Sequence, residues 1–150
     1  MAQSFSNLLI HLVFSTKYRN PVINQDMEPE LYIVMKGIAR NMNTHAIEIG
    51  GTEDHVHILL VLPRTGIISD TVRNIKSYSS RWVKEKDPAQ SNFSWQRGYA
   101  AFSVSYSSRN KVIEYIRMQK KIHENRSFQD EYRLILKMHE IHFDEKQIWA

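Results

Sequence analysis

Two pairs of residues have types and spacings that could do chemistry. His55 and His57 are separated by one residue in the run His55 to Leu62, which is otherwise apolar. Because side chains alternate along a strand, both imidazoles face the same side of it, about 7 Å apart at their Cα atoms. Two imidazoles at that separation can bind one divalent cation. The alternative is a solvated sheet face, but a buried pair needs a polar partner, and a metal ion would supply one.

The second pair is Tyr115 and Gln119, which stand four residues apart in a segment of helical pattern. Residues at this spacing lie on one helix face, one turn from each other. A helical tyrosine is usually an ordinary core or surface aromatic, so this pair has little meaning alone. The buried stripe of the helix does not need the tyrosine, since four residues supply it: Val112, Ile113, Ile116 and Ile122. Tyr115 is then at the edge of the stripe, where its hydroxyl could reach the sheet.

The hydrophobic pattern predicts the elements that must position these residues. Strands are expected over residues 7–15, 44–50, 55–62 and 99–105, and helices over residues 27–41, 69–86, 107–125 and 128–139. Ser69 and either Ser107 or Ser108 are the expected helix N-caps. The order β-α-β-β-α-β predicts an α+β fold: a four-stranded antiparallel sheet with helices on one face, the ferredoxin-like or RRM-like split βαβ arrangement, followed by C-terminal helices. No repeat or linker divides residues 1–150, so one domain is expected, with residues 127–150 as its C-terminal helical tail.

The composition is that of a globular domain with a sizeable core. The chain has 150 residues, of which 42% are hydrophobic and 24% charged. It has no cysteine, which excludes a disulfide framework, a thiolate zinc site and a cysteine nucleophile. The longest apolar run is far shorter than the roughly 20 residues that cross a bilayer, and the N-terminus does not resemble a signal peptide. We therefore expect a soluble, cytoplasmic protein without a membrane partner.

The charge is unevenly distributed along the chain. The net charge is +4, but residues 64–126 contain thirteen Lys or Arg against five Asp or Glu. Such a concentration of positive charge favours a polyanionic partner. Aromatic residues are interleaved with these charges, and single-stranded nucleic acid is bound by cations together with stacking planes. These aromatic residues are Tyr78, Trp82, Trp95, Tyr99 and Tyr106.

The motifs resemble, in order and over nearly the whole chain, the IS200/IS605-like single-domain Y1 transposases of the HUH superfamily. Residues 10–19 (IHLVFSTKYR) resemble the first strand and basic turn of that family, and residues 54–61 (DHVHILLV) its central strand. The stretches at residues 75–82 (IKSYSSRW) and 95–99 (WQRGY) are similar to the next helix and the approach to the fourth strand. Residues 112–119 (VIEYIRMQ) match the helix that carries the catalytic tyrosine.

The resemblance implies roles for particular residues. His55, His57 and Gln119 become metal ligands, and Tyr115 becomes the nucleophile. Neutral nitrogen and oxygen ligands suit Mg²⁺ or Mn²⁺. The role of Asp54 stays open between orienting a ligand and shaping the hairpin. Five further histidines are expected to be structural or solvent-exposed: His11, His45, His123, His139 and His142.

The function implied is that of a DNA transposase. It would cleave and rejoin single-stranded DNA at hairpin ends through a 5′-phosphotyrosine intermediate, as a homodimer in which Tyr115 acts in cis or in trans. The C-terminal stretch from Phe128 is expected to pack on the domain or at the dimer interface, without a catalytic part. Candidate stacking residues are Tyr78, Trp82 and Trp95. The basic residues expected to contact phosphates are Lys17, Arg19, Lys76, Arg81 and Arg97.

Three other functions remain open at this point. A domesticated relative would use the same chemistry on repeated palindromes. A non-catalytic nucleic-acid binder on an RRM-like sheet would need only basic and aromatic residues. A metal-dependent phosphoesterase that uses water would form no covalent adduct with DNA. Neither of the last two accounts for a tyrosine and a glutamine one turn apart beside a histidine pair.

Overall fold

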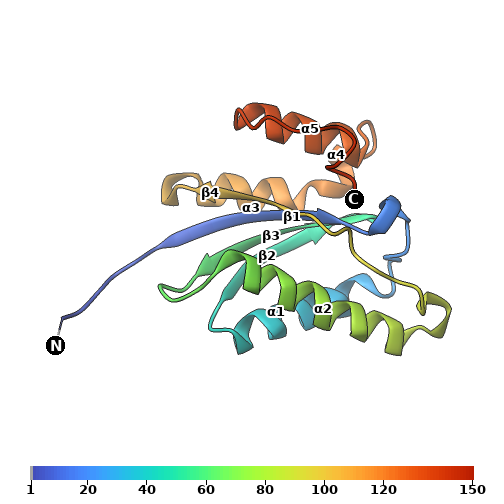
Figure 1. Cartoon of the computed structure of the whole chain (residues 1–150), viewed down its shortest axis with the longest axis horizontal. Coiled ribbons are helices and arrows are strands. Elements are labelled where there is room, and N and C mark those ends of the chain that lie inside the picture. Colours follow the sequence, from blue (N-terminus) through green and yellow to red (C-terminus); the bar gives the residue numbers. More distant parts are fainter. Residues whose placement is uncertain (1) are drawn as a thin grey trace.

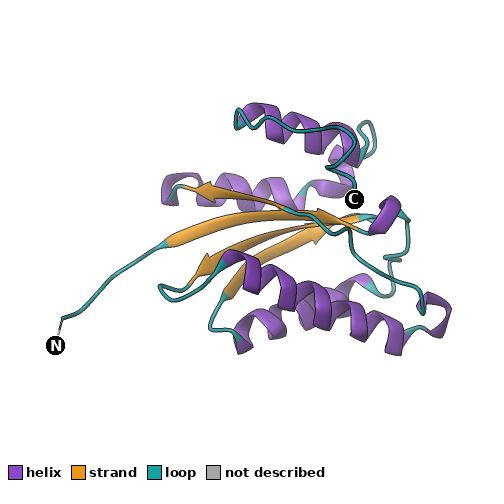
Figure 2. Cartoon of the chain, in the orientation of Figure 1, coloured by secondary structure: helices purple, strands orange, loops and turns teal. Residues whose placement is uncertain are grey.

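The computed structural model describes residues 2–150 and is built on one antiparallel sheet (Figures 1 and 2). Its strands are β1 (Leu8–Ser15), β2 (His45–Gly51), β3 (His55–Leu62) and β4 (Ala100–Val104). Their spatial order is β2-β3-β1-β4, and all neighbouring pairs are antiparallel. This is the split βαβ arrangement that the order of elements predicts.

Two helices cover one face of the sheet, as expected. They are α1 (Glu28–Asn41) and α2 (Ile68–Lys86), which lie side by side below the sheet in Figure 1. Alternate residues of β1 and β3, such as Leu12, Phe14 and Ile58, pack against them in the largest apolar cluster. Since successive strand residues point to opposite faces, the intervening positions must be covered from the other side.

The C-terminal helices provide that cover. They are α3 (Arg109–Arg117), the short α4 (Gln119–Ile122) and α5 (Phe128–Met138), and they lie above the sheet in Figure 1. Ile116 of α3 packs against Leu59, while Phe128 and Tyr132 of α5 pack against Val13 and neighbouring β4 residues. The sheet is therefore a middle layer, and β3 is buried on both faces because each has its own helical cover.

Two details of the helices differ from the sequence-based expectations. The helix expected over residues 107–125 is interrupted at Met118, whose backbone (φ −91°, ψ 10°) leaves the helical region. Neither serine cap forms: Ser69 lies inside α2, and Ser108 has a near-helical backbone from which its side chain makes no capping bond. An N-cap residue needs an extended backbone for its side chain to reach the helix amides. Ser127 has one, and it caps α5 by accepting a hydrogen bond from the Asp130 amide at 3.1 Å.

Short 3₁₀ turns complete the connections: η1 (Lys17–Arg19), η2 (Pro88–Gln90) and η3 (Tyr106–Ser108). Within residues 2–150, no helix combines the length and the apolar character needed to cross a membrane.

Candidate active site

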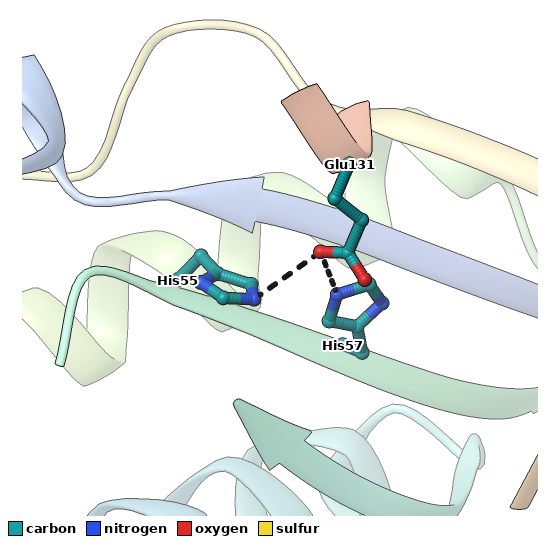
Figure 3. Close-up of side chains that lie close together, drawn as sticks. All are labelled: His55, His57 and Glu131. Carbon is teal, nitrogen blue, oxygen red and sulfur yellow. Dashed lines mark hydrogen bonds and ion pairs between the residues drawn. The ribbon is translucent and has the colours of Figure 1, made fainter. Parts of the chain in front are cut away.

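The histidine pair lies on the face of β3 that the C-terminal helices cover. His55 and His57 are both completely buried, and Figure 3 shows them pointing toward α5. The expectation that both imidazoles face one side of the sheet is confirmed. Because both imidazoles are shielded from water, each depends on a few specific polar partners.

Asp54 and Thr52 fix the orientation of His55. Its Nδ1 lies 2.8 Å from Oδ1 of Asp54 and 3.0 Å from the Thr52 hydroxyl. Burial alone would raise the pKa of Asp54, but the hydrogen bonds from His55 and Thr52, together with the charges of nearby histidines, outweigh it and the pKa is lowered. An ionised carboxylate accepts only, so Nδ1 of His55 carries the proton and Nε2 faces the site. Asp54 therefore holds the ring of a candidate ligand and also accepts a hydrogen bond from the Thr52 hydroxyl within the hairpin.

Gln119 faces the free nitrogen of His55. Its Oε1 lies 2.8 Å from His55 Nε2, and its Nε2 donates to Glu131 Oε2 at 2.9 Å. The second bond sets the orientation of the amide, because a carboxylate can only accept. The Gln119 oxygen and the His55 Nε2 lone pair are therefore two acceptors in contact, an arrangement that requires a proton or another cation between them.

Glu131 of α5 is the group that sequence reasoning missed. It is 1% exposed, and its Oε1 lies 3.1 Å from His57 Nε2 and 3.5 Å from His55 Nε2 (Figure 3). Burial would raise the pKa of Glu131, but hydrogen bonds from His123 and His57 outweigh it and hold the pKa well below its usual range. The expectation that the C-terminal stretch plays no part in the site is therefore wrong. The sequence did contain a sign that Glu131 is buried, because this glutamate falls within the apolar stripe of an amphipathic helix.

Tyr115 reaches the same cluster from α3. Its hydroxyl donates a hydrogen bond to Oε2 of Glu131, and its ring centroid is 5.7 Å from that of His57. Burial, followed by the negative charge of Glu131, raises the pKa of Tyr115 well above its usual value. The candidate nucleophile is therefore a neutral phenol beside the histidine pair of its own chain.

Two of the histidines expected to be structural or exposed belong to this cluster. His11 Nε2 lies 2.8 Å from His57 Nδ1, and burial lowers the pKa of His11 to about 3, so this ring is neutral. His123 Nε2 lies 2.9 Å from Glu131 Oε1 and 3.0 Å from Gln119 Oε1. His123 was detectable in the sequence, because it follows Gln119 by four residues, one helical turn.

The residues of this cluster fit a divalent metal ion. His55, His57 and Glu131 each offer a ligand atom, and these atoms all lie within 4.8 Å of one another. Gln119 adds an amide oxygen in contact with His55. The facing acceptors of Gln119 and His55 call for a cation, and Glu131 supplies a formal negative charge that a set of two histidines and a glutamine lacks.

Gly50 of β2 determines how closely α3 approaches the sheet. A Cβ atom at this position would lie 2.4 Å from the carbonyl oxygen of Ile116. Ile116 directly follows Tyr115, so the missing side chain of Gly50 allows the tyrosine helix to lie against the strand that pairs with β3. The glycine thereby places the phenol at the histidine pair.

The five basic residues expected to contact phosphates lie outside this cluster. Lys76 donates to the backbone carbonyls of Gln96, Arg97 and Gly98, so its ammonium ties α2 to the loop before β4. Arg19 donates to the Trp149 carbonyl and stacks on the Trp149 ring. Lys17 is half-buried with its ammonium 5.4 Å from the Tyr18 ring centroid, and the exposed Arg81 lies 5.6 Å from the Tyr78 ring centroid. Arg97 is exposed.

The aromatic residues expected to stack on bases differ in how far the core buries them. Trp95 is buried between Phe14 and Phe93, and its indole N–H donates to the Ser79 hydroxyl. Trp82 packs against the same core. The expectation that the Trp95 indole stacks on a base is therefore wrong, since the core covers its surface. Trp82 is half-buried, and its stacking stays a prediction. Tyr78 is 51% exposed, and the guanidinium of Arg81 lies 5.6 Å from its ring centroid.

Comparisons with known proteins agree with the motifs and the fold. The ISDra2 transposase TnpA of Deinococcus radiodurans is 27% identical over 114 residues, which cover 73% of this chain and 81% of the relative. The transposase for insertion sequence element IS200 of Salmonella typhimurium is 25% identical over 124 residues, covering 79% and 81%.

Two solved structures share the fold. A crystal structure of a Deinococcus radiodurans protein described as a transposase has a TM-score of 0.62 and 26% identity, covering 79% of this chain and 98% of the other. A REP-associated tyrosine transposase, solved with a REP hairpin, has a TM-score of 0.62 at 14% identity, covering 82% and 74%. The sequence pattern described as "Transposase IS200 like" matches residues 4–119. The chain belongs to the family of IS200-like transposases.

Proposed function

We propose that this transposase cleaves and rejoins single-stranded DNA by attack of Tyr115 on a phosphodiester, through a 5′-phosphotyrosine intermediate. The observation that carries the proposal is the hydrogen bond between Tyr115 and Glu131, whose other carboxylate oxygen contacts His57. A phenol, two imidazoles and a carboxylate from three separate elements thus converge within one chain. A protein that only binds nucleic acid has no need of a half-buried phenol beside two imidazoles and a carboxylate.

The covalent step is a transesterification. The phenol oxygen of Tyr115 bonds to phosphorus, the bond from phosphorus to the 3′ oxygen breaks, and the phenol proton passes to the departing oxygen by way of Glu131 or solvent. A phenol is a better leaving group than a sugar alcohol, so a 3′-OH can reverse the step and join the strand elsewhere. Tyr115 thereby conserves the energy of the broken bond for strand joining.

His55, His57 and Glu131 would hold a divalent ion, with Gln119 as a further ligand. Such an ion would polarise the scissile phosphate and offset the charge of Glu131 near the phenol. Asp54 keeps His55 in the tautomer that ligation needs. The histidines and Glu131 are at most 1% exposed, so DNA must displace part of the packing around them before a phosphate reaches the site.

The proposed DNA partner is a hairpin with unpaired flanking bases. The solved tyrosine transposase of the same fold is bound to a REP hairpin, which makes a hairpin a reasonable first substrate. A homodimer also remains a prediction. Since a single chain brings Tyr115 to its own histidines, we propose that the tyrosine acts in cis.

The test is formation of a covalent adduct. The protein is incubated with labelled single-stranded hairpin DNA and Mg²⁺ or Mn²⁺, then denatured and separated by size. We expect a labelled protein band with the wild type and none with Tyr115→Phe, which removes the attacking oxygen. Tyr106→Phe is the matched control, because Tyr106 is 72% exposed and lies outside the site. Cleaved DNA without any protein-bound label would instead establish hydrolysis by water.

A further inference from the structure

A pocket lies between α3 and α5, beside the candidate nucleophile. Its volume is about 230 Å³, and its lining includes Tyr115 of α3, His11 of β1 and Arg126 from the turn before α5. In Figure 1 both helices lie above the sheet. The volume is below the range of about 300–1,000 Å³ typical of drug-sized ligands, so the pocket suits one small chemical group.

Two of the lining residues belong to the catalytic cluster. Tyr115 donates a hydrogen bond to Glu131, and Nε2 of His11 lies 2.8 Å from Nδ1 of His57. Tyr115 is half-buried, whereas His55, His57 and Glu131 are at most 1% exposed. DNA that approaches the cluster through this pocket therefore meets the phenol before it meets the histidine pair.

Arg126 places a positive charge in the pocket. Its side chain is exposed, and none of the ion pairs among residues 2–150 involves it. The arginines before and after it in the sequence, Arg117 and Arg133, are instead paired with carboxylates. No Asp or Glu of the described residues lines the pocket. The guanidinium of Arg126 therefore keeps its charge and its donors for an anion from outside the chain.

The catalytic cluster also holds Arg126 in place. The Arg126 carbonyl accepts a hydrogen bond from Nδ1 of His123 at 2.6 Å, and Nε2 of the same ring lies 2.9 Å from Oε1 of Glu131. Burial and the charge of Glu131 raise the pKa of Tyr115, and the charge of Arg126 acts against them. The positive charge is thus close enough to the phenol oxygen to affect its ionisation.

A guanidinium beside a phenol nucleophile suits a phosphodiester. Arginine binds phosphate oxygens through pairs of N–H donors held in a fixed plane. When the phenol attacks phosphorus, negative charge spreads over the nonbridging oxygens, and a cation already in place stabilises that charge. The apolar side chains of Leu134, Ile135 and Met138 line the same pocket and offer a surface for the sugar next to the phosphate.

We propose that Arg126 is a catalytic residue, which binds the nonbridging oxygens of the phosphate held against Tyr115 in this pocket. The inference rests on the proposed function, because it assumes that single-stranded DNA enters the site. Arg126 lies beyond residues 4–119, which match the family pattern, so this contact comes from the C-terminal part of the chain.

The experiment tests one phosphate at a time and does not depend on cleavage. The full chain carrying Tyr115→Phe is used, without divalent metal, to select a binding DNA hairpin with unpaired flanks from a random pool. In a series of such hairpins, one flank phosphate after another is replaced by an uncharged methylphosphonate. The affinities of this parent are compared with those after adding Arg126→Ala or Arg126→Lys. Arg64→Ala is the matched control, because Arg64 is also exposed and lies in the turn after β3.

We expect one methylphosphonate position to weaken binding to the parent about tenfold, more than its neighbours do. Arg126→Ala should weaken binding of the unmodified hairpin by the same factor, and the methylphosphonate at that position should then cost nothing further. Arg126→Lys should keep part of the position dependence, because the charge remains and the paired donors are lost. Arg64→Ala should keep all of it. With Tyr115 restored, Arg126→Ala should form the adduct about 100-fold more slowly.

The proposal is overturned if the parent selects no hairpin, or if Arg126→Ala leaves the effect of every methylphosphonate unchanged. In the second case the guanidinium attracts DNA in general and binds no fixed phosphate. Adduct formation by Arg126→Ala at the wild-type rate also overturns it. The outcome is separable from the adduct test. A Tyr115-dependent adduct with an unchanged Arg126→Ala profile rejects the role of Arg126 alone, whereas an Arg126-dependent phosphate without any adduct rejects the covalent chemistry alone.

Discussion

The hydroxyl of Tyr115 on α3 donates a hydrogen bond to the carboxylate of Glu131 on α5, directly over the histidine pair. The family pattern ends at residue 119, so Tyr115 lies within it and Glu131 outside it. The C-terminal helix of this chain therefore contributes a buried negative charge to a site whose histidine pair, tyrosine and glutamine lie within the matched family pattern. That charge affects both metal affinity and the state of the phenol.

Replacing Glu131 by glutamine should weaken metal binding. The variant keeps the size of the side chain but removes a formal charge within 3.5 Å of both histidines. We expect the dissociation constant for Mn²⁺, measured by calorimetry with no DNA present, to rise by about 10–100-fold. Asp130→Asn is the control, because this neighbouring carboxylate is exposed and pairs with Arg133. Unchanged Mn²⁺ affinity in Glu131→Gln, with a loss in Gln119→Ala, would assign the oxygen ligand to Gln119 alone.

Mixing two inactive variants should not restore activity. Tyr115→Phe lacks the proposed nucleophile and His57→Gln lacks a proposed ligand, while each keeps the other group. Because one chain brings both groups together, no subunit of a mixed dimer has a complete site. The measurement is adduct formation by the mixture, with wild type mixed with each variant as the control for poisoning. Recovery of adduct in the mixture would show that the tyrosine acts in the partner's site.

Gly50→Ala should destabilise the protein and lower its activity together. The added Cβ would lie 2.4 Å from the Ile116 carbonyl oxygen and 2.9 Å from its side chain, so α3 must shift away from the sheet. Overpacking of this kind costs about 1–3 kcal/mol of unfolding free energy, measurable by urea denaturation. Gly37→Ala is the matched control, because its Cβ meets nothing within 4 Å and a helical alanine gains about 0.5–1 kcal/mol. Equal stability of the two variants would contradict the close approach of α3.

Lys76 should titrate well below the other lysines. Burial lowers the pKa of Lys76 from 10.5 to about 8. The unfolded chain then binds this proton more tightly than the folded chain, so the Lys76 contribution raises the free energy of unfolding as pH increases from about 8 toward 10.5. NMR titration of labelled lysine side chains should give one midpoint near pH 8 that is absent in Lys76→Met. A midpoint near 10.5 would mean that the ammonium is well solvated.

Much of the fold follows from local patterns. The strand β3 begins and ends where predicted, because the apolar run from His55 to Leu62 is bounded by a turn and a proline. The break at Met118 was not predictable from periodicity, since Tyr115, Gln119 and His123 keep helical spacing across it. The predictions of serine N-caps were also wrong. A serine side chain caps a helix only when its own backbone is extended, and the packing of the preceding turn determines that backbone conformation.

The sequence alone determined that two imidazoles face one side of a buried strand. It also determined that a tyrosine and a glutamine four residues apart point the same way, toward Glu131, although the helix breaks at Met118 between them. Both are consequences of the two-residue period of strands and the turn length of helices, which depend only on the local chain. Tertiary structure alone decided that Glu131, His11 and His123 join them. These contacts arise because β1 pairs with β3 in the sheet while α5 and the end of α4 cover the face on which the histidine pair lies. The energy that selects this arrangement is the burial of apolar surface shared among distant segments.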